Sequence, residues 1–230
     1  MRLFFSDNGI VLRKFNVGEK DQMVRVLTRS VGKRVFMAKG VRSPSSKKCG
    51  AVDVGQQVSL SSRSSKSGMW YLDQVKLERS SRELIRDSWD DLFGLLGFID
   101  MVLGDEQHVE GVYDLAAQAL ADLGIHEEVL VIFQVKLLSL LGFVPALDRC
   151  SVCGNRLDLS CSLGADIEHG GFVCCLALSS PVDFRLVKIL SFFQKAAWQD
   201  CLRLEVDGVL RAGMIAQMRP FLNGFSSARI

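Results

Sequence analysis

The sequence predicts an α+β fold, in which a small β-barrel is followed by a helical part that carries a cysteine-bearing insert. Three observations support this prediction. Five short apolar segments lie in the first 80 residues, apolar residues then recur at helical spacing, and a pair of cysteines interrupts the helical pattern. We therefore expect a barrel over 1–79, a helical domain over 80–147 and 179–230, and an insert over 148–178.

The segments predicted as strands are rich in Val, Leu, Phe and Tyr, and they are bounded by Gly, Asp, Ser and Lys. Residues 30–33 fit a hairpin connection between the second and the third strand. Five strands in a segment of this length fit a five-stranded barrel of the OB type. The predicted strands cover residues 9–15, 23–28, 35–38, 57–60 and 69–77.

The predicted helices begin where the strand pattern ends. Ser80 or Ser81 is a suitable N-cap for the first helix, in which apolar residues recur as far as Leu103. Gly124 and Gly142 stand where helix ends are expected. Further helices are expected over residues 109–123, 127–141, 182–198 and 210–222.

The compartment follows from what the sequence lacks. The first residues do not resemble a signal peptide, because the apolar run is three residues long and Asp7 follows it. The best membrane candidate, Val129 to Val144, is short and contains Gln134 and Lys136, so a buried helix explains it better. We expect a cytoplasmic protein whose seven cysteines are reduced or bound to metal.

The charges are divided unequally along the chain. Residues 1–80 contain 16 Lys and Arg against 6 Asp and Glu, a net charge of +10, whereas residues 81–230 have a net charge of −8. An OB-type barrel binds single strands by contacting phosphates with cations and stacking bases on aromatic rings. We therefore predict a nucleic-acid site formed by the clustered cations Lys33, Arg34, Lys39, Arg42, Lys47, Lys48, Arg63 and Lys66.

Aromatic residues suitable for stacking are also present in the barrel segment. They are Phe15, Phe36, Trp70 and Tyr71. Because successive strand residues point to opposite faces, Trp70 and Tyr71 cannot both lie in the core. The alternative interpretation is that the cations only solvate a small barrel and the aromatic rings fill it.

The insert contains a candidate zinc site. Cys150 and Cys153 are spaced so that both thiolates can bind one tetrahedral ion, and Gly154 permits the tight turn. The downstream partners are the adjacent Cys174 and Cys175, and Cys161 or His169 could replace Cys175 as the fourth ligand. The alternative is a site that has lost its metal and whose cysteines pack as core residues. No catalytic constellation is expected, because the carboxylates and histidines of the sequence are scattered.

The chain resembles the RecO family of bacterial DNA-repair and recombination-mediator proteins. The most specific match runs from Ala38 to Ser46, and further matches lie at 9–13, 18–21, 27–29, 32–33 and 219–230. Matches also lie at Leu141 to Pro145, which precedes the insert, and at Leu147 to Cys150, Cys153 to Gly154 and Gly170 to Cys174.

The resemblance implies an OB-fold, a helical domain and, in many members, a zinc-binding insert. It also implies a non-enzymatic, nucleoid-associated protein that binds single- and double-stranded DNA and anneals complementary strands. With RecR, and sometimes RecF, such a protein helps to load RecA onto single strands coated by single-strand binding protein (SSB), whose acidic tail is a further partner. The basic DNA-binding region of the family falls on Lys33, Lys39, Arg42, Lys47 and Lys48.

The sequence departs from the family pattern in two places. Zinc-bearing members have a second cysteine pair two residues apart, whereas here Ala177 stands where the last cysteine would be. Val52 to Val54 replaces a Pro-aromatic element after the basic loop. Three other functions remain open on the residues alone: an RNA-binding OB protein in translation or RNA handling, a metal-dependent nuclease, and an adaptor whose basic face binds an acidic protein.

Overall fold

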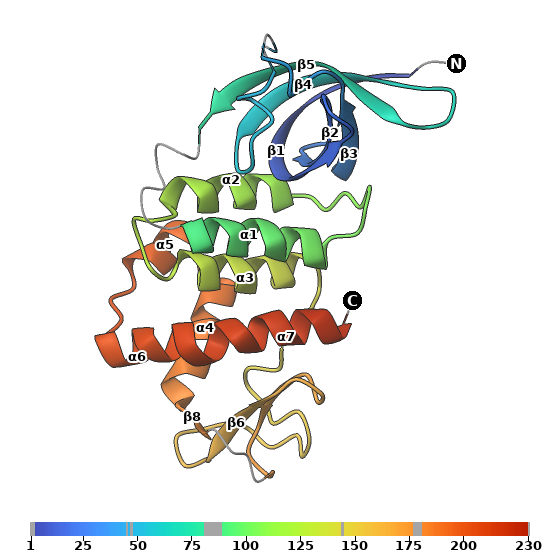
Figure 1. Ribbon diagram of the computed structural model, residues 1–230. Helices are drawn as coiled ribbons and strands as arrows, with labels where there is room; N and C mark the ends of the chain where they lie inside the picture. Colours follow the sequence, from blue (N-terminus) through green and yellow to red (C-terminus); the bar gives the residue numbers. More distant parts are fainter. Residues whose placement is uncertain are drawn as a thin grey trace. The chain divides into compact units, whose positions relative to one another are not determined.

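The computed structural model describes residues 3–44, 46, 48–80, 89–143, 145–176 and 181–229, the last five of these by their backbone alone. The chain forms two compact units, Met1–Ile125 and His126–Ile230. Figure 1 shows their helices and strands, coloured along the sequence. The division into segments ending at 79, 147 and 178 stays a prediction.

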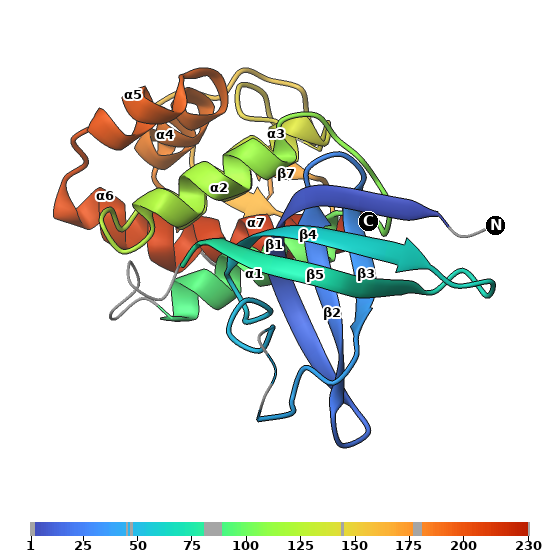
Figure 2. The ribbon, with the colours of Figure 1, turned by 90° about the horizontal axis from the view of Figure 1, so that it is seen from above.

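The first unit contains a closed five-stranded barrel in the order β1-β2-β3-β5-β4 (Figure 2). The pairs are antiparallel except for β3 and β5, which are parallel. The predicted OB-type barrel is therefore confirmed. The strands are β1 (Phe4–Val17), β2 (Asp21–Thr28), β3 (Gly32–Ala38), β4 (Gln57–Ser64) and β5 (Trp70–Arg79).

β1 is longer than predicted and pairs with two strands, β2 and β4. Its first part, Phe4 to Ile10, pairs with β4, and Gly9 to Val17 pairs with β2. The register shifts between Val11 and Arg13, and such an irregularity lets a strand bend. The sequence did not reveal the first part as strand because it includes the polar run Ser6 to Asn8.

The barrel is filled by the alternate residues of its strands. Its core includes Val24, Phe36 and Leu72, and Phe36 is completely buried. Trp70 packs against this core, whereas Tyr71 is not part of it. The structure thus decides which of the two neighbouring aromatic residues points inward.

Among its described residues, the first unit also contains the helices α1 (Trp89–Val102) and α2 (Val112–Asp122). The predicted helix start after an N-cap at Ser80 or Ser81 falls on residues 81–88, outside the described residues. The hairpin that was predicted over residues 30–33 connects β2 to β3. Gly32 there has φ +77°, and a Cβ at this position would collide with the carbonyl oxygen of Gln107.

The second unit is built around the buried helix α3 (Val129–Leu140), which packs against α4 (Phe184–Lys195) and α7 (Arg219–Arg229). The last two predicted helices, over residues 182–198 and 210–222, differ in their bounds from the structure. Asp183 caps α4, so this helix begins at Phe184, and it ends at Lys195 before the separate helix α5 (Trp198–Arg203). Asp207 caps the last helical run, which continues through α6 (Gly208–Gly213), a π-helical turn (Met214–Met218) and α7.

The insert contributes β6 (Leu163–Asp166) and β7 (Gly171–Val173) to a small three-stranded sheet, and β8 (Pro181–Val182), which follows the insert, is the third strand.

α3 is the most apolar helix, and nine of its twelve residues are buried. In the part of the chain that the structure describes, no helix is both long and apolar enough to cross a membrane.

One carboxylate joins the barrel to α1. Asp100 accepts hydrogen bonds from Arg25 at 2.9 and 3.1 Å, and its carboxylate lies 3.2 Å from the ammonium of Lys33. Lys33 also donates to the backbone carbonyl of Asp100 at 2.7 Å, and its side chain is only 6% exposed. A buried cation needs such partners, because its desolvation costs several kcal/mol.

We predict that Asp100→Ala lowers the free energy of unfolding by about 3 kcal/mol, because it removes the nearer of the two carboxylates beside the buried Lys33 ammonium. Asp114→Ala is the control, since Asp114 forms an ion pair with Arg29 in which both side chains are more than half exposed. Its loss should cost less than about 1 kcal/mol. Urea unfolding followed by circular dichroism measures both, and equal effects would contradict the role given to Asp100.

Candidate nucleic-acid interface and metal centre

Two of the predicted cations are engaged by acidic groups that follow the barrel in sequence. Lys33 is held by Asp100, as described above, and it also lies 3.7 Å from Asp105. Arg34 donates to Glu106 at 3.0 Å, and its guanidinium stacks over the Trp70 ring at 4.6 Å. The sequence gave no signal for these acidic partners, because they lie about 70 residues away from the cations. Both cations therefore have a structural role.

Other predicted cations are more accessible. The ammonium of Lys39, an exposed residue, lies 5.1 Å from the centre of the Tyr71 ring. Arg42 is exposed and donates to the backbone carbonyl of Gly18 at 3.2 Å. Lys48 is half-buried and donates to the carbonyl of Leu72 at 2.9 Å. Lys47 lies outside the described residues.

The last two predicted cations lie at the end of β4 and in the turn that follows it. Arg63 is half-exposed and lies 3.3 Å from Asp73, and Lys66 is exposed in the turn. Arg63 is also the β4 neighbour of Tyr71 on β5. The accessible cations therefore include Lys39, Arg42, Arg63 and Lys66. The loop residues Lys39, Arg42 and Lys66 can contact a phosphate without breaking an ion pair with a buried carboxylate.

The four candidate aromatic residues separate into two groups. Phe36 is buried in the core, and Trp70 packs against the core with Arg34 above it. Phe15 is 42% exposed, and Tyr71 is partly exposed outside the core cluster. Phe15 and Tyr71 are therefore the two that a base can reach.

The predicted nucleic-acid site did not include Arg13, which lies beside one of the two accessible rings. Its guanidinium lies 4.9 Å from the centre of the Phe15 ring, and its side chain is 61% exposed. The sequence indicated this position, because Arg13 and Phe15 are two residues apart on one strand and therefore point to the same face. The arrangement places a cation beside each of the two accessible rings.

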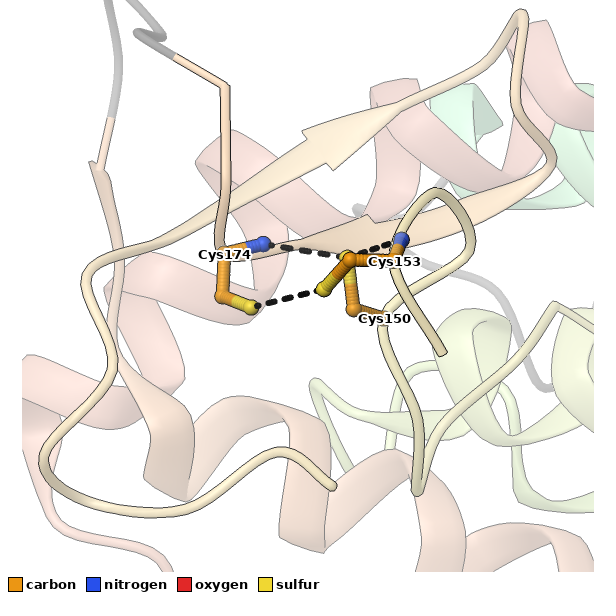
Figure 3. A group of neighbouring side chains, drawn as sticks. All are labelled: Cys150, Cys153 and Cys174. Atoms are coloured by element: carbon orange, nitrogen blue, oxygen red, sulfur yellow. Dashed lines mark hydrogen bonds between the residues drawn. The ribbon is translucent and has the colours of Figure 1, made fainter. Parts of the chain in front are cut away.

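The insert brings three cysteines together. The sulfurs of Cys150, Cys153 and Cys174 all lie within 4.8 Å of one another, and this group could hold a metal ion (Figure 3). Cys153 Sγ and Cys174 Sγ are 3.7 Å apart. A zinc ion that binds sulfur at about 2.3 Å in tetrahedral geometry separates its sulfurs by about 3.8 Å. The observed spacing therefore fits zinc without rearrangement of these two side chains.

Backbone groups stabilise a thiolate in this cluster. Burial opposes ionisation of the Cys150 thiol, but the backbone N–H groups of Cys153 and Cys174 donate to its sulfur and bring its pKa down to about 5. Burial and the neighbouring sulfurs raise the pKa of Cys174 to about 12. One thiolate thus hinders the ionisation of the next, and a bound cation would remove this repulsion.

Of the three candidates for the fourth ligand, only Cys175 contacts the cluster. Its sulfur lies 3.7 Å from Cys150 Sγ, although it does not belong to the group of three sulfurs that are mutually close. Cys161 instead contacts Asp158, and the ring of His169 bonds to Asp166 at 3.0 Å. Cys175 is therefore the best placed of the three.

The second unit also contains an apolar groove of about 560 Å³. It lies between α4 and the segment 204–210, and a volume of this size accommodates a few side chains of a ligand. The charges that line it are balanced, because two cations, Arg185 and Lys188, and two carboxylates, Glu205 and Asp207, are among its lining residues. Its apolar lining is formed by Leu159, Phe184, Ile189, Leu204, Val206 and Leu210.

The N-terminal and the C-terminal part of the chain both match models of the same protein family. Residues 1–81 match the family model "Recombination protein O N terminal", and residues 95–218 match "Recombination protein O C terminal". The DNA repair protein RecO of Caldanaerobacter subterraneus is 28% identical over 224 residues, which are 90% of this chain and 87% of that protein. RecO of Thermoanaerobacter sp. is 27% identical over 225 residues, 92% of this chain and 88% of that protein.

RecO of Bacillus mycoides is 27% identical over a shorter stretch of 177 residues, which covers 75% of this chain and 70% of that protein. The family models together span most of the chain and agree with the barrel and the helical units found above. The chain belongs to the RecO family of DNA repair proteins.

Proposed function

We propose that this protein binds single- and double-stranded DNA, anneals complementary strands and, with RecR, helps to load RecA onto SSB-coated single strands. The observation that carries the proposal is the set of accessible cations on the outer surface of the barrel, Lys39, Arg42, Arg63 and Lys66. Their task is non-enzymatic, since binding and pairing of strands need no chemical step.

Electrostatics explains how such a surface promotes annealing. Two phosphate backbones repel each other, and a multivalent cationic surface lowers this cost while base edges remain free to pair. Lys39 and Arg42 lie close together in sequence after β3, and Lys66 lies in the turn between β4 and β5. Contacts from loops give affinity without sequence preference, which suits a protein that must act on any strand.

The partners are proposed from family membership. They are DNA, RecR, the acidic tail of SSB and, in some settings, RecF, in the cytoplasm near the nucleoid. The negative charge that follows the barrel lies in residues 81–125, which have a net charge of −8 and are a poor DNA surface, whereas residues 126–230 have no net charge. We assign DNA contacts to the barrel and protein contacts to the second unit, where the apolar groove lies.

We further propose that the cysteine cluster holds a structural zinc ion, bound by Cys150, Cys153, Cys174 and Cys175. The supporting observation is the 3.7 Å spacing of the two sulfur pairs, Cys153 with Cys174 and Cys150 with Cys175. A four-cysteine site with no open position is typical of structural zinc, which stabilises a fold and does not activate water. The ion would join the turn after Cys150 to the segment after β7.

The test of the DNA function measures binding of a fluorescent mixed-sequence single strand over a salt series, and then annealing with its complement. We expect tight binding at low salt, faster annealing, and a linear fall of log K with log salt. Binding of RNA alone, or no binding at low salt, would overturn the proposal.

The combined variant Lys39→Ala/Arg42→Ala/Lys66→Ala locates the surface. Removal of three phosphate contacts should reduce the steepness of log K against log salt by about 2, since each contributes about 0.7 on single strands. The control Lys188→Ala/Lys195→Ala/Arg203→Ala changes the net charge equally but lies in the second unit. Equal loss in the two variants would show that overall charge, and not this surface, is responsible.

Metal content tests the zinc proposal. We expect one zinc per chain by plasma mass spectrometry, and its loss in Cys150→Ser, Cys153→Ser and Cys174→Ser, because each removes a ligand. Cys161→Ser is the matched control and should keep the ion, since Cys161 contacts Asp158. A wild-type protein without zinc, or loss of zinc in the control, would contradict this site. Retention of full affinity by Cys175→Ser would exclude Cys175 as the fourth ligand.

A further inference from the structure

The strand registers align two side chains of β1 and one from each of the other four barrel strands into a continuous row. Phe15 on β1 pairs with Met23 on β2, Met23 pairs with Met37 on β3, and Met37 pairs with Tyr71 on β5. The row continues from Tyr71 to Arg63 on β4 and from Arg63 to Phe4 on β1. We call these six residues the barrel row: Phe15, Met23, Met37, Tyr71, Arg63 and Phe4.

The barrel row faces outward. The neighbouring row, which includes Val24, Phe36 and Trp70, points into the barrel core or packs against it. Paired residues share a face and successive residues alternate, so the barrel row must lie on the opposite, outer side. The exposed fractions agree, since Phe15 is 42% and Phe4 is 79% exposed, and no member belongs to the core cluster.

Cations stand beside the rings of this row. Arg13 lies over Phe15, and Lys39 lies over Tyr71, with 4.9 and 5.1 Å between the charged group and the ring centre. Arg63 is itself a member of the row, next to Tyr71. A surface of this composition offers π-faces and polarisable thioethers to planar groups and positive charge to phosphates.

We propose that the barrel row is the base-stacking surface for single-stranded DNA, an inference that rests on the DNA-binding function proposed above. Bases stack on Phe15 and Tyr71 and contact the thioethers of Met23 and Met37 between them, while Lys39 and Arg13 move from the ring faces to the phosphates. Three strand spacings of about 4.8 Å separate Phe15 from Tyr71, about 14 Å in total. A four-stranded sheet of this width stacks about two or three bases in other nucleic-acid-binding folds.

The proposal explains why an unpaired strand would be preferred. In a duplex the bases are already stacked on one another, so a duplex can use only the phosphate contacts of this surface. A single strand can use both the cations and the row. The row therefore adds affinity for single strands specifically, and the cations add affinity for both.

An oligonucleotide without bases separates stacking from phosphate contact. We would compare the wild-type protein on three fluorescent probes of equal length: a mixed-sequence single strand, the same strand made of abasic units, and a duplex. The row predicts that the wild type binds the base-containing strand about 5- to 150-fold more tightly than the abasic strand for each ring engaged.

The variant Phe15→Ala/Tyr71→Ala should lose this difference and leave duplex binding unchanged. The conservative variant Phe15→Trp/Tyr71→Phe keeps both rings and should retain the difference. Phe93→Ala is the control, because Phe93 is an aromatic residue of α1 that is 55% exposed outside the row. Unchanged duplex binding also shows that the double-alanine variant is folded.

The outcomes distinguish failure of the barrel row from failure of DNA binding itself. Equal wild-type affinity for the base-containing and abasic strands would overturn the row and leave DNA binding intact. A difference that survives in Phe15→Ala/Tyr71→Ala would also overturn the row, since the bases would then stack elsewhere. Absence of wild-type binding to all three probes would instead overturn the DNA-binding function itself.

Discussion

The barrel is closed by two residue pairs between the parallel strands β3 and β5, Phe36 with Trp70 and Met37 with Tyr71. The first pair faces the core, and the second lies on the outer surface. The same contact therefore completes the hydrophobic interior and joins the outer residues of β1, β2 and β3 to those of β5 and β4. If this closure were lost, the aromatic residues of the surface would no longer form a continuous row.

The positive charge of the barrel segment has two uses. Lys33 and Arg34 pair with Asp100 and Glu106, so part of the charge attaches the helical elements of the first unit to the barrel. Lys39, Arg42 and Lys66 remain accessible. Net charge alone overstates the DNA surface, because a cation that is buried against a carboxylate cannot bind a phosphate without leaving that carboxylate unpaired.

Much of the fold followed from local sequence patterns, whereas the site followed only in part. Alternating apolar residues revealed five strands, and the two-residue spacing of Cys150 and Cys153 revealed the cysteine cluster that the structure shows. Strand register could not be predicted, because the pairing of Met37 with Tyr71 joins residues 34 positions apart. The inward orientation of Trp70 and the acidic partners of Lys33 depend on the same long-range contacts, which no local pattern encodes.

Photocrosslinking would identify directly the residues of the barrel that bases touch. A single strand that carries 5-iodouracil would be irradiated in complex with the protein, and crosslinked peptides would be identified by mass spectrometry. We expect crosslinks at Phe15, Tyr71 and the methionines between them on the outer surface of the barrel. Crosslinks confined to the second unit, His126–Ile230, would contradict this expectation.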